Sequence, residues 1–338
     1  MPDLPARAVA FVDYPKGLPS LETFSLVDAP ARAPQPGEVQ VRNLWMSVDP
    51  YMRGRMVNRK SYVPPFQPGQ ILEGGAIGEV IESAADGFKP GDLVEHFFGW
   101  REAVTAKADG FRVLNTHGLA PQTFLGVAGM PGLTAYVGLT RIAKLQAGER
   151  LFVSASAGAV GSLVCQIGKI VGAHVTASAG SPEKCDWLKE IGADAVVNYK
   201  NAPDWTVLAG ALKEAQPEGF DVYFENVGGD HLAAALERMR PKGRIAVCGM
   251  ISQYNAERPE PGPPNLANII IKSLRVEGFV VSDYFDKAGD FAKALGGWVA
   301  EGKVQWRETV REGLEAAPQA FLDLFAGENL GKMLVKLD

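Results

Sequence analysis

The chain has 338 residues and a formal net charge of −5, with 46% hydrophobic and 22% charged residues. This composition is typical of folded proteins, which excludes disorder as the main state, and the length allows two domains. The mildly acidic balance argues against nucleic acid or an anionic membrane as the main partner. Three cysteines are too few for a disulfide framework, and there is no run of about 18 apolar residues and no apolar signal core at the start. We therefore expect a cytoplasmic protein without a membrane span.

The first third of the sequence predicts a β domain. Residues 38–44 alternate between apolar and polar side chains after a turn at Pro36 and Gly37. Two further strands are expected at residues 75–83 and 92–98.

From Arg150 onward, β-branched runs alternate with amphipathic runs of helical length. This alternation predicts an α/β fold, a Rossmann-type doubly wound parallel sheet. The expected strands cover residues 151–155, 174–177, 195–197, 222–225, 244–248 and 274–281, and the expected helices lie near 160–171, 183–191, 204–215, 230–239 and 287–301. A last strand at residues 331–337 is expected to return to the first domain.

Residues 154–161 indicate a dinucleotide-binding loop, because they follow the first strand of this run and open its first helix. Gly158 would let the backbone approach a pyrophosphate, and Gly161 would let the helix pack close to the sheet. The free N–H groups of the helix N-terminus would then face the phosphates. Ser156 replaces the first glycine of the usual motif. The alternative is a glycine-lined turn that packs without a ligand.

The end of the second strand of this run favours NADP(H) over NAD(H). NAD-selective sites usually have an acid there that binds the ribose hydroxyls. In the stretch of residues 177–184 no acid stands at the strand end, Ser178, Gly180 and Ser181 are small and polar, and Lys184 lies one turn into the next helix. Glu183 is adjacent to Lys184, but successive helical residues point in different directions. A cation without a repelling carboxylate suits a 2′-phosphate; the alternative for Lys184 is an ordinary solvated helix lysine.

The sequence lacks the residues of two other chemistries. Residues 1–125 contain no cysteine, and their only histidines are His96 and His117, too few for a tetrahedral zinc site. No G-x-S-x-G nucleophile motif occurs. Hydride transfer without a metal remains, and it favours a substrate whose developing negative charge is an enolate held by hydrogen bonds.

Seven segments, which run in order along nearly the whole chain, resemble those of a known family. The chain resembles the zinc-independent branch of the medium-chain dehydrogenase/reductases. Within that branch it is similar to the group of prostaglandin reductases, leukotriene hydroxydehydrogenases, plant alkenal double-bond reductases and bacterial curcumin reductases. The segments are residues 47–56 (SVDPYMRGRM), 129–136 (GMPGLTAY), 157–161 (AGAVG), 198–200 (NYK), 225–229 (ENVGG), 248–254 (CGMISQY) and 328–332 (ENLGK).

The resemblance implies a GroES-like substrate domain at residues 1–125, a Rossmann NADP-binding domain at 126–298 and a C-terminal return to the substrate domain at 299–338. It implies that Tyr254 and Tyr51 flank the substrate as catalytic residues; for both, the alternative is a packing tyrosine. The implied cofactor contacts are Gly158, Ala159, Val160, Gly161, Lys184, Tyr199, Asn226, Cys248, Gly249, Met250, Ile251, Ser252, Gln253, Tyr254, Phe279, Val280, Val281 and Asn329. By the same resemblance, residues 158–161 would lie on the pyrophosphate, Lys184 and Tyr199 at the 2′-phosphate, Asn226 near the ribose and residues 248–254 on the nicotinamide side.

Three details of the site stay open. Gln253 stands where the mammalian prostaglandin reductases carry Thr, which leaves the finer substrate pocket undefined. Asn226 has the alternative of a turn former beside two glycines. Arg53 and Arg55 suit either an acidic substrate or ion pairs with local carboxylates.

The expected function is NADPH-dependent reduction of the C=C bond of an α,β-unsaturated aldehyde or ketone. One alternative is a quinone reductase, which uses the same cofactor and no metal. Another, from a different class, is a non-catalytic NADPH-binding protein with a structural role. A homodimer is expected because residues 274–281 would leave an unpaired sheet edge, and pairing across a two-fold axis covers such an edge; the resemblance implies the same arrangement.

Overall fold

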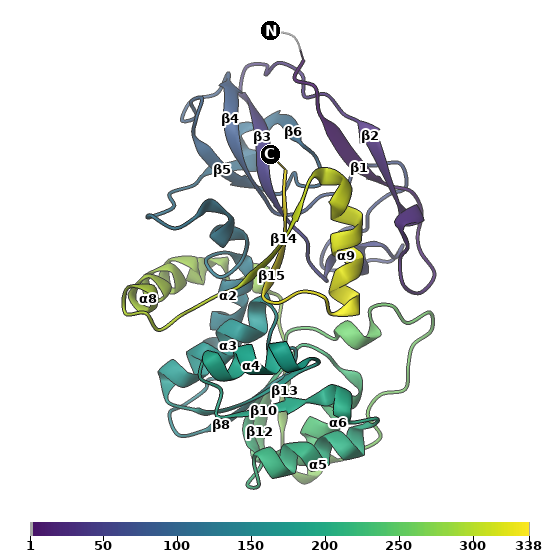
Figure 1. Cartoon of the computed structure of the whole chain (residues 1–338), viewed down its shortest axis with the longest axis vertical. Helices are drawn as coiled ribbons and strands as arrows, with labels where there is room; N and C mark the ends of the chain where they lie inside the picture. Colours follow the sequence, from purple (N-terminus) through teal and green to yellow (C-terminus); the bar gives the residue numbers. More distant parts are fainter. Residues whose placement is uncertain (1–2, 338) are drawn as a thin grey trace. The chain divides into compact units, whose positions relative to one another are not determined.

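The alternating segments after Arg150 form a six-stranded sheet in which every pair of neighbouring strands is parallel (Figure 1). In spatial order its strands are β10 (Ala195–Asn198), β9 (His174–Ala179), β8 (Arg150–Val153), β11 (Phe220–Glu225), β12 (Met239–Val247) and β13 (Arg275–Gly278). The order reverses between β8 and β11. The expected doubly wound Rossmann sheet is therefore confirmed.

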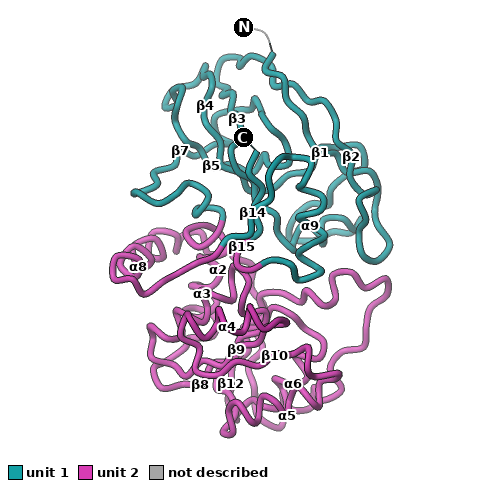
Figure 2. The backbone as a smooth tube through the Cα atoms, viewed as in Figure 1, with its two compact units in different colours: residues 1–125, 308–329, 333–338 teal, residues 126–307, 330–332 magenta. Residues whose placement is uncertain are grey.

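The computed structural model describes residues 3–337 and divides the chain into two units (Figure 2). The first unit comprises residues 1–125, 308–329 and 333–338; the second comprises 126–307 and 330–332. The boundary expected after residue 298 falls inside the last helix of the second unit. That unit continues to Arg307, because Val304 is buried in its core and Gln305 exchanges hydrogen bonds with Gln166.

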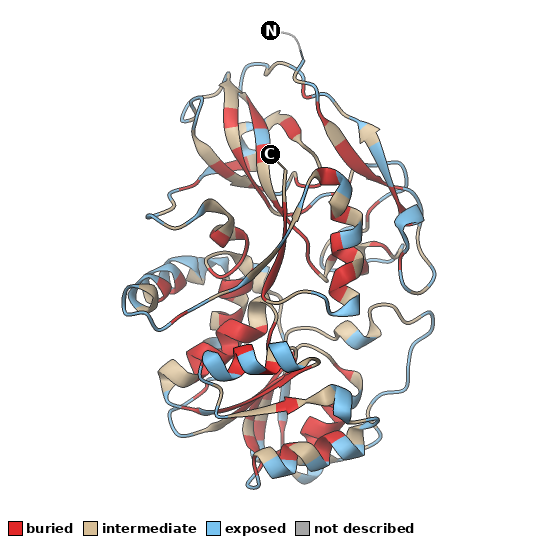
Figure 3. Cartoon of the chain, viewed as in Figure 1, coloured by how far each residue is buried: buried red, intermediate tan, exposed pale blue. Residues whose placement is uncertain are grey.

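Helices cover both faces of the parallel sheet, because apolar side chains on its central strands alternate between two cores. On β8, Leu151 and Val153 belong to one core, whereas Phe152 belongs to the other. The first core packs against α2 (Met130–Val137), α3 (Ala159–Val171), α4 (Pro182–Glu190) and α8 (Ala288–Ala300), and the second against α5 (Trp205–Ala215) and α6 (Gly229–Arg238). Red buried segments on the strands and on the inner helix faces mark these two cores (Figure 3). A short helix, α7 (Asn268–Ile271), precedes β13.

The first unit is built on a seven-stranded sheet, most of whose neighbouring strands pair antiparallel. Its strands are β14 (Glu308–Glu312), β15 (Lys332–Lys336), β3 (Glu38–Ser47), β4 (Ala76–Ser83), β5 (Leu93–His96) and β7 (Phe111–Val113), with β6 (Ala103–Lys107) also on β3. A two-stranded sheet of β1 (Arg7–Phe11) and β2 (Phe24–Asp28) and the helices α1 (Met52–Arg55) and α9 (Ala317–Ala326) complete it. The C-terminal strand pairs with β3, so Leu334 lies opposite Ser47.

Three elements differ from expectation. The strand expected over residues 274–281 ends at Gly278, and Val281 already begins a 3₁₀ helix. The sequence stays apolar after Gly278 for another reason: the ring of Phe279 packs edge-on against Phe224, although its backbone is no longer part of the strand. α9 and β14 were not predicted, because their stretches were taken as a short tail.

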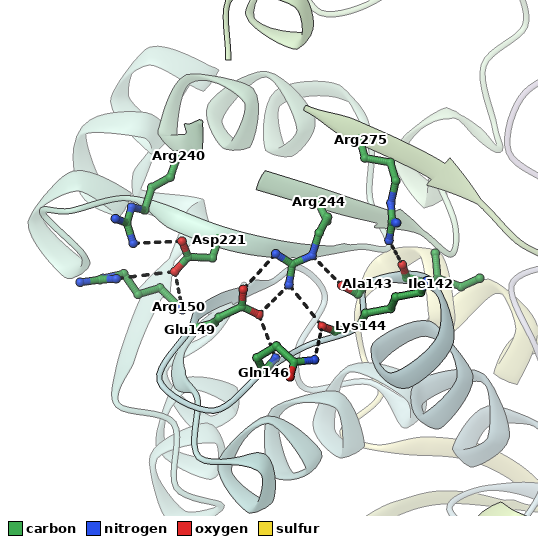
Figure 4. A network of polar contacts seen from close by, with 10 residues as sticks. All are labelled: Ile142, Ala143, Lys144, Gln146, Glu149, Arg150, Asp221, Arg240, Arg244 and Arg275. Carbon is green, nitrogen blue, oxygen red and sulfur yellow. Dashed lines mark hydrogen bonds and ion pairs between the residues drawn. The ribbon is translucent and has the colours of Figure 1, made fainter. Parts of the chain in front are cut away.

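An arginine network fastens the amino-terminal edge of the parallel sheet (Figure 4). Arg244 on β12 binds both carboxylate oxygens of Glu149, at 2.9 and 2.6 Å, and its Nε donates to the Ala143 carbonyl at 2.7 Å. Arg275 on β13 donates to the Ile142 carbonyl. Ala143 and Ile142 end the π-helical turn Gly138–Ile142, so the two guanidinium groups cap a helix end that would otherwise leave carbonyls unpaired.

Among the described residues, no helix is both long and apolar enough to cross a membrane.

Replacing Arg244 with lysine tests this network. Lysine keeps the charge but loses the planar fork that binds Glu149 through two nitrogens and reaches Ala143. We expect the free energy of unfolding, measured by urea titration, to fall by about 1–3 kcal/mol. Because the network lies at the edge opposite the strands' carboxyl ends, affinity for NADP(H) should stay unchanged, and a weakened affinity would contradict this assignment.

Candidate active site

The order reversal of the parallel sheet places two strand ends side by side. β8 ends at Val153 and β11 ends at Glu225, and the two strands are direct neighbours. In open α/β sheets, ligands bind beyond the carboxyl ends of the strands at such a point. The residues that follow these two strands are therefore the first to examine.

The loop after β8 is built to receive an anionic group. Gly158 is the N-cap of α3 and provides no side-chain cap, and within the part of the chain that the structure describes no partner accepts from the N–H groups of Ala159, Val160 and Gly161. A Cβ at Gly161 would lie 2.4 Å from the carbonyl oxygen of Ala155, so glycine is required there. Unpaired N–H groups at the positive end of a 13-residue helix fit a pyrophosphate.

A second corner of the site lies at the ends of β9 and β10. Ser181 caps α4 by accepting from the N–H of Lys184 at 3.3 Å, which places this lysine in the first turn. Tyr199 follows β10, and its hydroxyl lies 2.8 Å from where a Cβ on Gly180 would be. Any side chain at position 180 would displace this hydroxyl. The structure thus brings Lys184 and Tyr199, the two residues expected at the 2′-phosphate, to one edge of the sheet, with Gly180 beside the tyrosine.

Burial keeps the two aromatic side chains at this corner, His231 and Tyr199, uncharged. The ring of His231 packs edge-on against Tyr199, with centroids 4.9 Å apart. Burial lowers the pKa of His231 to about 4, so the imidazole is neutral at pH 7. Burial also raises the pKa of Tyr199, whose hydroxyl therefore stays protonated and able to donate a hydrogen bond.

The segment Cys248–Tyr254, expected beside the nicotinamide, folds onto the loop that follows β11. The N–H groups of Ile251 and Ser252 donate to the carbonyls of Asn226 and Val227, at 3.2 and 3.0 Å. The Tyr254 hydroxyl lies 3.4 Å from the Met250 N–H, which points the phenol back along this loop. Among the remaining contacts expected here, Cys248 and Gly249 follow β12, Gln253 lies in the short 3₁₀ turn, and Phe279 and Val280 follow β13 before the turn at Val281.

Asn226 has a structural role in the absence of any ligand. Its side-chain amide donates to the Ser154 carbonyl at 2.7 Å, and its backbone N–H donates to the Ser154 hydroxyl at 2.9 Å. Both bonds join the loop after β11 to the loop after β8. The interpretation as a turn former is therefore too narrow, because the side chain connects two strand ends.

A contact from the C-terminal tail was missed by the sequence analysis. The Gly331 N–H donates to the carbonyl of Ala157 at 2.8 Å and forms a bridge with Gly158. The next N–H, of Lys332, donates to Arg307 at 3.0 Å. A Cβ on Gly331 would lie 1.8 Å from the Arg307 carbonyl oxygen, so only glycine fits. The signal was present in the segment ENLGK, but only its Asn329, which belongs to the first unit, was singled out.

Tyr51 lies in the first unit, where it precedes α1. Burial, and next the carboxylate of Asp49, raise the pKa of its phenol, so it stays protonated. Of the neighbouring arginines, Arg53 is buried and donates to the Gly17 carbonyl at 2.7 Å. Arg55 pairs with Glu73 at 3.1 Å and stacks on Phe66, so the ion-pair interpretation holds for this residue.

Metal-ligating side chains do not gather anywhere in residues 3–337: no group of three or more His, Cys, Asp or Glu side chains there is placed to hold a metal ion. His96 is buried, and burial lowers its pKa to about 3. The thiols of Cys165 and Cys248 are also buried, and burial raises the pKa of each to about 12.

Comparison with known proteins agrees with this geometry. Residues 7–114 match the family described as N-terminal domain of oxidoreductase, and residues 159–298 match the family described as zinc-binding dehydrogenase. The NADPH-dependent curcumin reductase of Escherichia coli is 40% identical over 98% of this chain and 96% of its own length. The chain belongs to the medium-chain dehydrogenase/reductase family. Its similarity to the curcumin and alkenal reductases places it in the zinc-independent branch.

Two further relatives cover nearly the whole chain. The 2-alkenal reductase (NADP(+)-dependent) of Nicotiana tabacum is 42% identical over 97% of this chain and 96% of its own length. The crystal structure of CurA in complex with NADPH from Vibrio vulnificus superimposes with a TM-score of 0.93, at 38% identity, covering 98% of this chain and 99% of that one. The cofactor of this chain is NADP(H), and the α3 N-terminus and the Lys184 corner fit its phosphates.

Replacing Gly331 with alanine tests the tail contact. The new Cβ would collide with the Arg307 carbonyl oxygen and push the bridge away from Gly158, so we expect the Kd for NADPH to rise about ten-fold or more. Fluorescence titration with NADPH measures this effect.

Gly302→Ala is the matched control for this substitution. Gly302 has a similar φ of +68°, against +73° for Gly331, but open space around it. The control therefore adds the backbone strain without the collision. An equal loss of affinity in both variants would remove Gly331 from the cofactor site.

Proposed function

We propose that the protein reduces the C=C bond of α,β-unsaturated aldehydes and ketones with NADPH. The observation that carries the proposal is the similarity to reductases of this kind over nearly the full length of the chain, together with an uncapped α3 N-terminus and a lysine corner that suit NADPH.

Bound NADPH supplies a hydride, which would go to the β-carbon of the enone. The protein's part is to hold the ligand and to stabilise the negative charge that develops on the carbonyl oxygen. Tyr254 suits this task, because its hydroxyl lies near the Met250 N–H, and a phenol that accepts a hydrogen bond is a better donor. Tyr51, whose phenol also stays protonated, is the second candidate donor in this scheme.

The C=C bond is favoured over the C=O bond by the charge that each reaction creates. Hydride addition at the β-carbon produces an enolate, which spreads its charge and is stabilised by a few hydrogen-bond donors. Direct carbonyl reduction produces a more basic alkoxide, for which such donors do less. The α-carbon then takes a proton from a tyrosine or from water.

Product analysis with deuterated NADPH and a simple enone tests the proposal. We expect a saturated ketone with deuterium at the β-carbon, and almost no turnover of saturated ketones or aldehydes. Tyr254→Phe removes the donor and keeps the ring, so turnover should fall about ten- to a hundred-fold while NADPH binding changes little.

Three outcomes would contradict this scheme. An allylic alcohol labelled at the carbonyl carbon would overturn C=C reduction. Quinone turnover without enone turnover would favour the quinone reductase, and no oxidation of NADPH by any enone or quinone would favour the non-catalytic alternative. An unchanged rate in Tyr254→Phe would remove this residue from the mechanism.

The cofactor preference has its own test at Lys184. A charge-assisted contact to phosphate is worth about 1.5–3 kcal/mol, so Lys184→Ala should weaken NADPH about ten-fold or more and leave NADH unchanged. Lys189→Ala is the control, because Lys189 lies on the same helix and pairs with Asp186 on the surface. Equal Michaelis constants for NADPH and NADH in the unmutated protein would refute the preference.

We further propose that the chain forms a homodimer through β13. This strand ends the parallel sheet, so one of its edges has no neighbour among the described strands. Apolar side chains lie exposed on it and just before it: Val276 is 41%, Ile270 83% and Ile271 74% exposed. Pairing with the same strand of a second copy would cover these side chains and continue the sheet.

The substitution Val276→Lys tests the dimer by placing a charge on this edge. Light scattering at micromolar concentration should report the mass of a dimer for the unmutated protein and a lower mass for the variant. Val113→Lys is the matched control, because Val113 is 46% exposed on β7, the end strand of the other sheet. A monomer in the unmutated protein would refute the proposal.

The cytoplasm is the compartment we propose. All three cysteines, Cys165, Cys185 and Cys248, are free thiols, which suits a reducing compartment.

A further inference from the structure

Glu225, the last residue of β11, is a carboxyl group that none of the expected site roles includes. It is fully buried, with 0% of its surface exposed. No lysine or arginine of the described chain forms an ion pair with it. A buried carboxyl without a cation is costly unless its hydrogen bonds serve a purpose, so its partners need an explanation.

The side chain of Glu225 joins two loops of the cofactor site. Its Oε1 accepts from the N–H of Val227 at 2.6 Å and from the hydroxyl of Ser154 at 3.1 Å. The Ser154 hydroxyl in turn accepts from the phenol of Tyr223 at 3.0 Å and from the N–H of Asn226 at 2.9 Å. The loop after β8 and the loop after β11 therefore share one fully buried set of hydrogen bonds.

The backbone of Glu225 holds a third loop. Its carbonyl accepts from the N–H groups of Cys248 and Gly249, at 2.9 and 3.2 Å. These residues begin the segment expected beside the nicotinamide. One residue thus binds the loops assigned to the pyrophosphate, the ribose and the nicotinamide.

We propose that Glu225 is a positioning residue that fixes these three loops relative to one another, so that the cofactor site exists before NADP(H) binds. The inference rests on the proposed function only in taking these loops to be the cofactor site. Ser154 and Tyr223 are its partners, and none of the three needs to touch the cofactor.

The surroundings of the carboxyl favour its neutral form. Burial raises its pKa, against the opposing effect of bonds from Gly228, Tyr223, Val227 and Ser154. The titratable groups around it are Tyr223 on its own strand and Cys248 at the end of β12, and burial keeps both protonated. Its Oε2 has no hydrogen-bond partner within the described chain, which a neutral carboxyl tolerates better than an ionised one.

Charge is the second reason for a neutral group. An ionised Glu225 would place a negative charge beside loops that must bind phosphates. Because the folded-state pKa is raised, the neutral form is fully present below the ordinary glutamate pKa of about 4.5, and its contribution is lost as pH rises through the raised value.

The experiment measures NADP⁺ binding by isothermal titration calorimetry for the unmutated protein, Glu225→Gln and Glu225→Ala. Glutamine keeps the shape and the acceptor but never ionises, so its Kd should stay within about two-fold of the unmutated value near neutral pH. Alanine breaks the set of bonds, so its Kd should rise about ten-fold or more. Asp221→Ala is the matched control, because Asp221 lies on the same strand, β11, but at its amino end, where it pairs with Arg240.

The pH dependence separates positioning from a merely structural role. As pH rises through the raised pKa of Glu225, the Kd of the unmutated protein should rise relative to that of Glu225→Gln, because only the former ionises; the titration of NADP⁺ is common to both. A glutamine variant that binds NADP⁺ as weakly as the alanine variant, or an alanine variant that folds by circular dichroism and binds NADP⁺ as tightly as the unmutated protein, would overturn the proposal. No enone is used, so a failure of C=C reduction would be distinguishable from a failure of this inference.

Discussion

The hydrogen bonds that converge on Ser154 are the constraint on which the candidate site depends. Parallel strands end together at one edge of a sheet, but nothing in the sheet itself fixes the loops beyond that edge. Here one serine after β8 binds Glu225, Asn226 and Tyr223 of β11 and its loop. Two loops that would otherwise move independently therefore have a fixed spacing, which is what a ligand that contacts both loops requires.

Most of the fold followed from the sequence, because periodicity reports which side of an element is buried. The alternation of β-branched runs with amphipathic runs after Arg150 predicts the parallel sheet, and in the structure Leu151 and Val153 of its first strand belong to one core and Phe152 to the other. Where the pattern had a second cause, it misled: the apolar run after Gly278 reflects packing of Phe279 against Phe224, not a longer strand.

The site was harder to predict, because its parts are defined by contacts between distant segments. Lys184 is a candidate that local sequence alone can propose, because no acid stands at the end of β9 and the lysine follows in the next helix. The tail contact of Gly331 with Ala157, and the bond between Ser154 and Glu225, join residues 174 and 71 positions apart. A single sequence shows that each residue is present, but only the fold shows that they meet.

Half-buried acids at the amino ends of the parallel strands are paired with cations, whereas the buried acid at the carboxyl end of β11 is not paired with one within the described chain. We attribute this difference to the cofactor. At the amino-terminal edge, Arg244 and Arg240 are matched by the carboxylates of Glu149 and Asp221. At the carboxyl edge, the buried acid has no matching cation and its pKa is raised. A cation bound to Glu225 would not be free to meet a phosphate. A neutral carboxyl keeps the hydrogen bonds that position the loops and leaves the positive end of α3 without a competing anion.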